Sequence, residues 1–151
     1  MTRQEKYPET STFHYYNANP YNRFTTDCVI RAICTALEMP YNIVLMEMAQ
    51  LQCETGYDSR ENKLIDLYLK SKGWVKHKQP RKADNTKYTG VEFCKAISKD
   101  IFSLGKSIVA NIGGGHIVCI KPIGGSVRNN HKVHDTWDST DGCIGIYWTK
   151  A

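Results

Sequence analysis

The sequence lacks the segments that mark a membrane or exported protein. It contains no run of about 18 apolar residues, so no transmembrane helix is predicted. The first eight residues are polar and lack the apolar core of a secretory signal peptide. Internal repeats are also missing. We therefore expect a cytoplasmic protein without a membrane partner.

Metal-ligand spacings are missing as well. The six cysteines form no Cys-x-x-Cys pair and no spacing typical of a zinc site. Most of them fall among apolar residues of predicted helices or strands, where a free cysteine packs as a small hydrophobic residue. We expect free thiols in a reducing compartment, and neither a metal nor a cofactor.

Charge is present in modest excess. The chain of 151 residues is 41% hydrophobic and 23% charged, with a formal net charge of +5. This balance predicts one globular domain over residues 13–151, preceded by a flexible arm over residues 1–12. Cations are densest between Lys63 and Lys87. We interpret this stretch as a solvated surface rather than a site for an acidic partner, so nucleic-acid binding is not expected.

Helical periodicity dominates the first half of the chain, and strand patterns dominate the second half. The first core helix is predicted to begin at Cys28 and to end before Pro40. Further helices are predicted over residues 41–53 and 60–71 and after the capping-box sequence Thr89-Gly90-Val91-Glu92. Strands are predicted over residues 107–112, 116–120, 132–135 and 143–148, with turns at the glycines 113–115 and 124–125. The order predicts an α+β fold with N-terminal helices packed on a C-terminal antiparallel sheet.

Three residues have the chemistry of an activated-thiol site. Cys28 stands at a predicted helix start, where unpaired backbone N–H groups and the helix dipole favour the thiolate. His116 begins a predicted strand after three glycines, and Asp135 closes the next predicted strand. A thiol, a base and an acid that orients the base are the parts of a nucleophilic triad. We therefore predict Cys28, His116 and Asp135 as catalytic residues.

Other residues compete for two of these positions. His134 is the main alternative base, but strand alternation points its side chain away from the face of Asp135. Asp138 is the alternative acid, although it is also well placed to cap the turn that follows it. Of the remaining histidines, His14 and His77 lack a nearby acid or a structured position, and His131 is expected to lie in a turn.

The order of these residues resembles that of papain-like cysteine peptidases. Asp135-Thr136-Trp137 looks like the family's Asn-Ser-Trp element, in which the tryptophan shields the hydrogen bond of the histidine from water. Asn22 lies six residues before Cys28, where the family usually carries the glutamine of its oxyanion hole. The pattern is closest to small bacteriocin-leader peptidases, which have aspartate as third member, and to uncharacterised papain-like proteins of phages and prophages.

The resemblance implies a papain-like fold and a cysteine peptidase or amidase-type hydrolase. Its acyl-enzyme would be a thioester formed from a peptide or isopeptide bond, and its substrate a peptide or protein of the host cytoplasm if the chain is phage-encoded. The oxyanion hole would combine the backbone N–H of Cys28 with the amide of Asn22, or of Asn17 or Asn19 in its place. Two alternatives stay open: a catalytically silent binding module that blocks a host factor, and a cell-wall amidase or endopeptidase.

Overall fold

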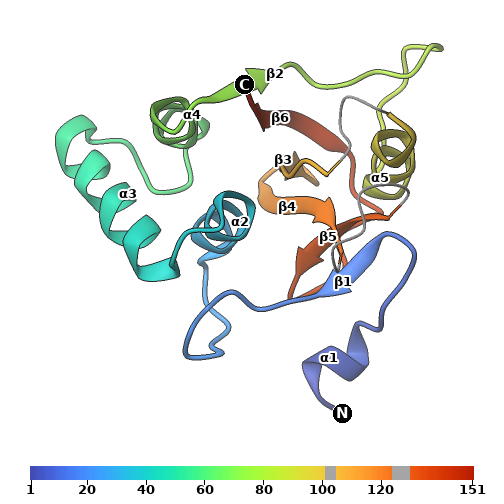
Figure 1. Ribbon diagram of the computed structural model, residues 1–151, viewed down its shortest axis with the longest axis horizontal. Coiled ribbons are helices and arrows are strands. Elements are labelled where there is room, and N and C mark those ends of the chain that lie inside the picture. The colour runs from blue at the N-terminus through green and yellow to red at the C-terminus, as the bar shows by residue number, and fades with distance from the viewer. Residues whose placement is uncertain (101–104, 124–129) are drawn as a thin grey trace.

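The computed structural model describes residues 1–100, 105–123 and 130–151, and it is built around a six-stranded mixed sheet (Figure 1). The helices among these residues are α1 (Arg3–Lys6), α2 (Cys28–Leu37), α3 (Tyr41–Thr55), α4 (Asn62–Ser71) and α5 (Gly90–Lys99). The strands are β1 (Phe13–Tyr15), β2 (Trp74–His77), β3 (Ile108–Ile112), β4 (His116–Pro122), β5 (His131–Asp135) and β6 (Ile144–Lys150). This is an α+β fold, as the sequence predicts.

The sheet differs in one respect from the expected C-terminal antiparallel sheet. Its strand order is β1-β5-β4-β3-β6-β2, and the four central strands all come from the second half of the chain and pair antiparallel. Both edges, however, come from the first half, and β1 pairs parallel to β5 with Phe13 opposite Val133. The expectation of a purely antiparallel sheet was wrong because these edge strands are too short to show a period-2 pattern.

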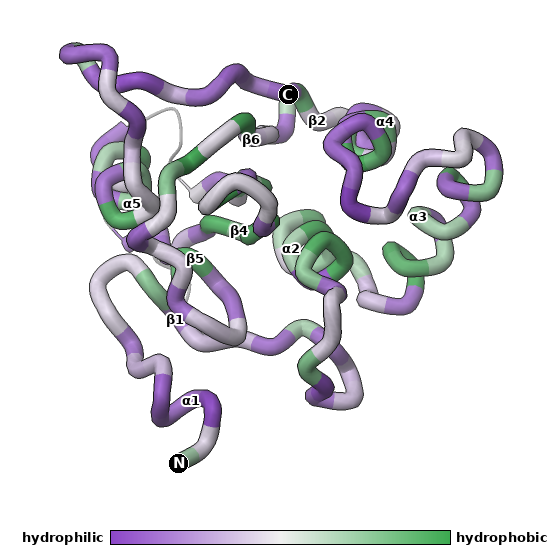
Figure 2. Tube along the Cα trace, turned by 180° about the vertical axis from the view of Figure 1, so that it is seen from behind, coloured by the Kyte–Doolittle hydropathy of each residue, from purple (hydrophilic) through white to green (hydrophobic). Residues whose placement is uncertain are grey.

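Both faces of the sheet are covered. One face packs against α2 and α4 in a cluster that includes Ile33, Leu64, Cys119 and Trp148. The other face packs against α5, with Phe93 at the centre of a second cluster. Alternating side chains along β3 and β4 feed the two clusters. Figure 2 shows α2 as a strongly hydrophobic segment beside the strands, which fits a helix whose residues from Val29 to Ala36 are all buried.

Local signals set most helix ends. Helix α3 begins directly after Pro40, and α2 ends with Glu38 in the left-handed conformation. At α5 the capping box is formed as predicted: the Thr89 hydroxyl accepts from the backbone N–H of Glu92, whose carboxylate accepts from the N–H of Thr89. The turn predicted at Gly124-Gly125 lies outside the described residues.

The N-terminal segment contacts the sheet. Within residues 1–12, expected to form a flexible arm, α1 carries a capping box between Thr2 and Glu5. The guanidinium Nε of Arg3 donates to the carbonyl oxygen of Thr136 at 2.8 Å. Flexibility of this arm stays a prediction. In the described ranges no single helix is long and apolar enough to cross a membrane; only α2 and α3 taken together, across a bend of 118°, reach the length and composition of a span.

Candidate active site

Cys28 is the first residue of α2, and its thiol is held from two sides. The side chain of His116 and the backbone N–H of Ile117 lie beside its sulfur and lower the pKa of the thiol. Asp27 occupies the N-cap position, but its side chain makes no capping hydrogen bond. The backbone N–H groups of the first turn, including that of Cys28, therefore keep their positive dipole directed at the thiol and at whatever binds beside it.

His116 and Asp135 lie on neighbouring antiparallel strands. His116 opens β4, Asp135 closes β5, and Nε2 of the imidazole is 2.5 Å from Oδ2 of the carboxylate. Because Nε2 is engaged by Asp135, Nδ1 is the ring nitrogen left to face Cys28. The structure thus brings the three predicted residues together in the order thiol, imidazole, carboxylate.

The pKa values of these groups are shifted in the direction of an ion pair. Burial on its own would raise the pKa of Cys28, but the hydrogen bonds from His116 and Ile117 and the charges of His116 and Arg31 outweigh it and lower that pKa. Burial would lower the pKa of His116, whereas Asp135 and Cys28 raise it to about 9. The pKa of Asp135 is lowered: burial opposes this, and His116 and Arg31 overcome burial. The lowered pKa of Cys28 and the raised pKa of His116 both favour the thiolate–imidazolium pair over the neutral pair.

Arg31 is a member of the site that the sequence reasoning missed. Its Nη1 donates to Oδ1 of Asp135 at 2.6 Å, and its Nε donates to Oδ1 of Asp27 at 2.8 Å. The residue is only 8% exposed. One carboxylate oxygen of Asp135 is therefore bound to Arg31 and the other to His116, which fixes the orientation of the carboxylate. The signal was available, because Arg31 is a charged residue in the middle of an otherwise apolar helix.

Trp137 lies against the imidazole, as the resemblance predicts. The rings of His116 and Trp137 are 4.9 Å apart between centroids and tilted by 41°. Thr136 lies between Asp135 and Trp137 in the sequence, and its backbone N–H donates to Oδ1 of Asp135 at 2.7 Å. The indole packs beside His116, and Asp135 is only 2% exposed, so the bond between His116 and Asp135 lies in a medium of lower dielectric than water.

The predicted oxyanion asparagine is placed differently. Asn22 is exposed, has a φ of 55°, and its side-chain oxygen accepts from Nδ2 of Asn17. Asn19 donates to Oδ2 of Asp27 at 3.0 Å. None of the three is among the residues that line the cavity beside Cys28. In the described part of the chain, Cys28 supplies a backbone N–H at this site, and the amide N–H groups of Asn17 and Asn19 are engaged elsewhere.

The competing residues have other partners. Nε2 of His134 lies 3.2 Å from the carbonyl oxygen of Lys121, and burial lowers the pKa of His134 to about 4. Oδ1 of Asp138 accepts from the backbone N–H and the hydroxyl of Thr140, as expected of a turn cap. The other histidines also contact groups away from Cys28: His14 pairs with Glu9, His77 with Thr149, and His131 with the carbonyl oxygen of Lys106.

A cavity of about 260 Å³ opens at Cys28 and His116. Trp137, Gly115 and Thr136 form its sheet side, and the loop before α2 contributes Phe24, Thr25 and Thr26. Its remaining lining residues are arginines: Arg3, Arg23, Arg31 and Arg60. A cavity of this volume accommodates one or two side chains of a longer substrate.

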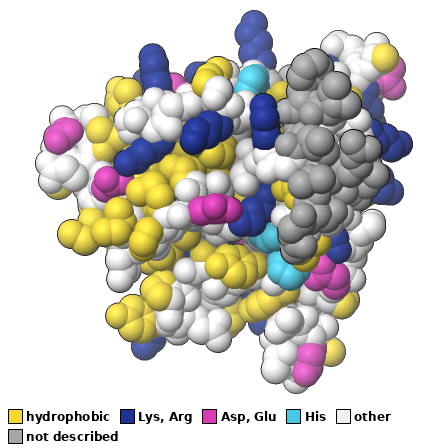
Figure 3. Space-filling model, in the orientation of Figure 1, with side chains coloured by type: hydrophobic (Ala, Val, Ile, Leu, Met, Phe, Trp, Pro, Cys, Tyr) yellow, Lys and Arg dark blue, Asp and Glu magenta, His cyan; other side chains and the backbone are white. Residues whose placement is uncertain are grey.

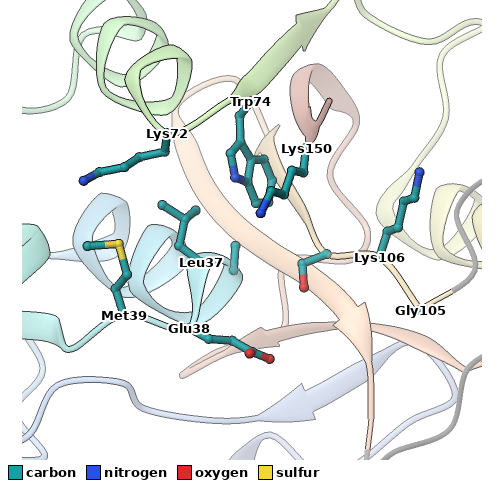
Figure 4. Close-up of a pocket in the computed structure, with 10 residues that line it drawn as sticks. Leu37, Glu38, Met39, Lys72, Trp74, Gly105, Lys106 and Lys150 are labelled. Atoms are coloured by element: carbon teal, nitrogen blue, oxygen red, sulfur yellow. The ribbon is translucent and has the colours of Figure 1, made fainter.

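A larger cavity, of about 430 Å³, lies at the other end of α2 (Figure 4). Leu37, Glu38 and Met39 line it together with Trp74, Lys72, Lys106 and Lys150. A helix of ten residues is about 15 Å long, so this cavity is remote from the thiol. Among the described residues, neither a cysteine nor a histidine lines it. The same face of the molecule carries hydrophobic side chains over α3 (Figure 3), where Ile43, Leu45 and Met46 are exposed. Neither feature has the chemistry of the Cys28 site.

Comparison with models of known protein families found no match to this chain. Comparisons with curated proteins and with solved structures also found no significant match.

Proposed function

We propose that the chain is a papain-like cysteine hydrolase that cleaves an amide bond. The observation that carries the proposal is the placement of Cys28, at a helix N-terminus, beside His116, which is in turn hydrogen-bonded to Asp135. A buried helix packed on antiparallel strands, with the thiol on the helix and the base and acid on the strands, supports the papain-like part. The resemblance extends the proposal to a phage-encoded protein acting on a peptide or protein in the host cytoplasm.

The chemistry follows from the placement of the groups. The Cys28 thiolate attacks the carbonyl carbon, and the oxygen that becomes negative is stabilised by the backbone N–H of Cys28. His116, protonated at Nδ1, gives its proton to the leaving amine as the C–N bond breaks, and a thioester remains. Neutral His116 then takes a proton from water, which attacks the thioester and releases the acid. Asp135 keeps the imidazole in the required orientation and stabilises its protonated form.

The first test is the pH dependence of alkylation of Cys28 by iodoacetamide, read by peptide mass spectrometry. At pH ~6 an ordinary thiol is almost wholly protonated, so we expect Cys28 to react at least about tenfold faster than the exposed thiols Cys53 and Cys143. His116→Ala should remove the advantage, whereas His134→Ala should keep it. The buried Cys119 reports whether each variant is still folded, because it reacts only after unfolding.

A Cys28 rate that rises only near pH ~8.5 would contradict the proposal, because no thiolate would be held in the folded protein. The catalytically silent binding module would then be the better interpretation. If the thiolate is present, release of labelled fragments from purified cell walls separates a cell-wall amidase from a peptidase of the cytoplasm.

A further inference from the structure

The cavity beside Cys28 is rich in arginine. Four of the six arginines of the sequence line it, although lysines outnumber arginines in the chain. Neither a lysine nor an acidic residue is among its lining residues. A guanidinium offers a planar pair of donors that matches a carboxylate, whereas an ammonium is a point charge. The composition of the lining is therefore that of a site for anions.

Three of these charges have no carboxylate partner among the described residues. Arg31 is committed to Asp27 and Asp135. The guanidinium groups of Arg3, Arg23 and Arg60 form no ion pair with any carboxylate in the part of the chain that the structure describes, and all three residues are exposed. By contrast, several exposed acids elsewhere are paired, such as Glu9 with Lys132 and Glu47 with Lys72. Unpaired arginine charge thus lies around the nucleophile, apart from the lysines between Lys63 and Lys87.

Arg3 is held in place at the site. Its Nε donates to the carbonyl oxygen of Thr136, next to Asp135, and its Cζ lies 4.9 Å from the centroid of the Phe24 ring. These contacts join the loop after β5 to the loop before α2. They leave the two terminal nitrogens of the guanidinium available to a ligand. Because the Arg3 side chain is already ordered, binding a ligand costs less side-chain entropy.

We propose that the substrate of the Cys28 site is an acidic polypeptide segment, with an aspartate or glutamate beside the amide bond that is cleaved. The proposal rests on the function proposed above and names its substrate class. A carboxylate on the substrate would pair with Arg3, Arg23 or Arg60 while the neighbouring carbonyl reaches the thiol. A nucleic acid is the less suitable anion, because it needs an extended track of cations, whereas these arginines surround a cavity of about 260 Å³.

The experiment compares two alkylating agents that differ in charge, iodoacetate and iodoacetamide. The ratio of their rates is measured at Cys28 and divided by the same ratio at Cys53, which corrects for intrinsic reactivity. We expect a ratio well above one that falls about tenfold in the triple variant Arg3→Gln, Arg23→Gln, Arg60→Gln, because each exposed charge contributes a factor of roughly 1.4 to 5. Added salt should lower the ratio in the wild type. Arg81→Gln, an exposed arginine away from the cavity, is the matched control.

A second arm uses peptidyl chloromethyl ketones that are identical except for aspartate or asparagine at one position. The aspartate probe should label wild-type Cys28 about tenfold faster, and the triple variant should lose the preference. Equal labelling by both probes at every position tested, with a fast iodoacetamide reaction at pH ~6, would overturn the acidic substrate and leave the hydrolase intact. A slow iodoacetamide reaction would overturn both.

Protection experiments separate the two kinds of polyanion. An oligoglutamate peptide should slow alkylation of Cys28 at a concentration where single-stranded DNA of equal charge does not. Protection by DNA alone would overturn the acidic polypeptide in favour of nucleic acid.

Discussion

Arg31 is the residue on which the candidate site depends most. A buried guanidinium without a partner would be very unfavourable, and here it is bound to two carboxylates, Asp27 and Asp135. Asp27 is held in turn by Asn19 and by the hydroxyl of Tyr41. The helix that carries the thiol is therefore linked through one side chain to the acid that orients the imidazole.

We predict that Arg31→Gln destabilises the fold by about 3 to 5 kcal/mol, because it leaves two buried carboxylates without their cation. Urea unfolding measures the change. Arg60→Gln removes an exposed arginine from the same cavity and should change stability by no more than about 0.5 kcal/mol. Equal effects of the two substitutions would mean that the ion pairs of Arg31 contribute nothing to the folded state.

Asp135→Asn should move the alkylation profile of Cys28 to higher pH. Asp135 helps to raise the pKa of His116 to about 9. Without the carboxylate that pKa falls, so the imidazolium that favours the thiolate is lost at lower pH. The measurement is the pH at half-maximal alkylation rate. Asp138→Asn, whose carboxylate only caps a turn, should leave the midpoint in place, and a shift of the same size there would contradict the assignment of Asp135.

The thiol, imidazole and carboxylate of the candidate site were predictable because their residues carry local signals. Cys28 follows capping residues at a helix start, His116 follows glycines, and Asp135 precedes a tryptophan two residues on. Arg31 could have been singled out as a charge in an apolar helix, but its partners and the grouping of the cavity arginines depend on which residues fold next to them. Arg3 and Asp135 are 132 positions apart in the sequence, and no periodicity connects them.

At the scale of elements, α5 is fixed by a close approach at its first residue. The backbone N–H of Gly90 donates to the carbonyl oxygen of Gly142, and that of Val91 donates to the carbonyl oxygen of Thr140. A Cβ added at Gly90 would lie 2.9 Å from Cα of Thr140 and 2.9 Å from Cδ1 of Ile112. The backbone of Thr140 would have to move to admit a side chain at residue 90.

Gly90→Ala should therefore destabilise the protein by about 1 to 3 kcal/mol through overpacking. Helix propensity alone predicts the opposite sign, since alanine is favoured over glycine in a helix by about 1 kcal/mol. The sign of the change in unfolding free energy, measured by thermal or urea unfolding, decides between overpacking and helix propensity. Gly115→Ala, where an added Cβ meets nothing within 4 Å, is the control and should be close to neutral.

The edge strand β1 was missed from the sequence, and its energetic importance can be tested directly. Phe13 is 0% exposed and packs with the cluster around Phe93. Phe13→Ala should cost about 3 to 5 kcal/mol of unfolding free energy. Phe24→Ala, at a residue 55% exposed, should cost much less. A small effect at Phe13 would mean that β1 is not an integral part of the sheet.

The helices and strands differ in how well their sequence patterns predict them. The longer helices were predicted from their helical periodicity and from a flanking proline, glycine or capping box. The four central strands were predicted from β-rich runs bounded by turn residues. β1 and β2 have three and four residues, and each becomes a strand only through its partner: β1 through β5 and β2 through β6. Parallel pairing of β1 with a strand more than 100 residues away leaves no local trace.

For the whole molecule, the arrangement places the candidate site where the helical half meets the sheet. α2 packs against β4 on one face of the sheet, so the distance from Cys28 to His116 is set by helix–sheet packing rather than by a loop. Packing of this kind is rigid, because buried apolar side chains interlock with few voids. The reactivity of Cys28 should therefore be lost when the whole domain unfolds.

That stability should fall in mild acid, and His134 is the residue that sets the first window. Its imidazole is half-buried against His14 and Lys121, and its pKa is lowered from 6.5 to about 4, chiefly by burial. In the unfolded chain the same group takes up a proton near pH ~6.5. The folded state, which binds fewer protons, thus loses up to about 3 kcal/mol as the pH falls from ~6.5 through about 4.

His134→Gln removes this titration. We expect the difference in unfolding free energy between wild type and variant to shrink, or to change sign, between pH 7 and pH 4, as measured by urea unfolding at each pH. The carboxylates of Asp27 and Asp135, whose pKa values are lowered against the effect of burial, stabilise the fold above their unfolded values and lose that effect only at lower pH. A difference that stays constant down to pH 4 would mean that His134 titrates alike in the folded and unfolded chain.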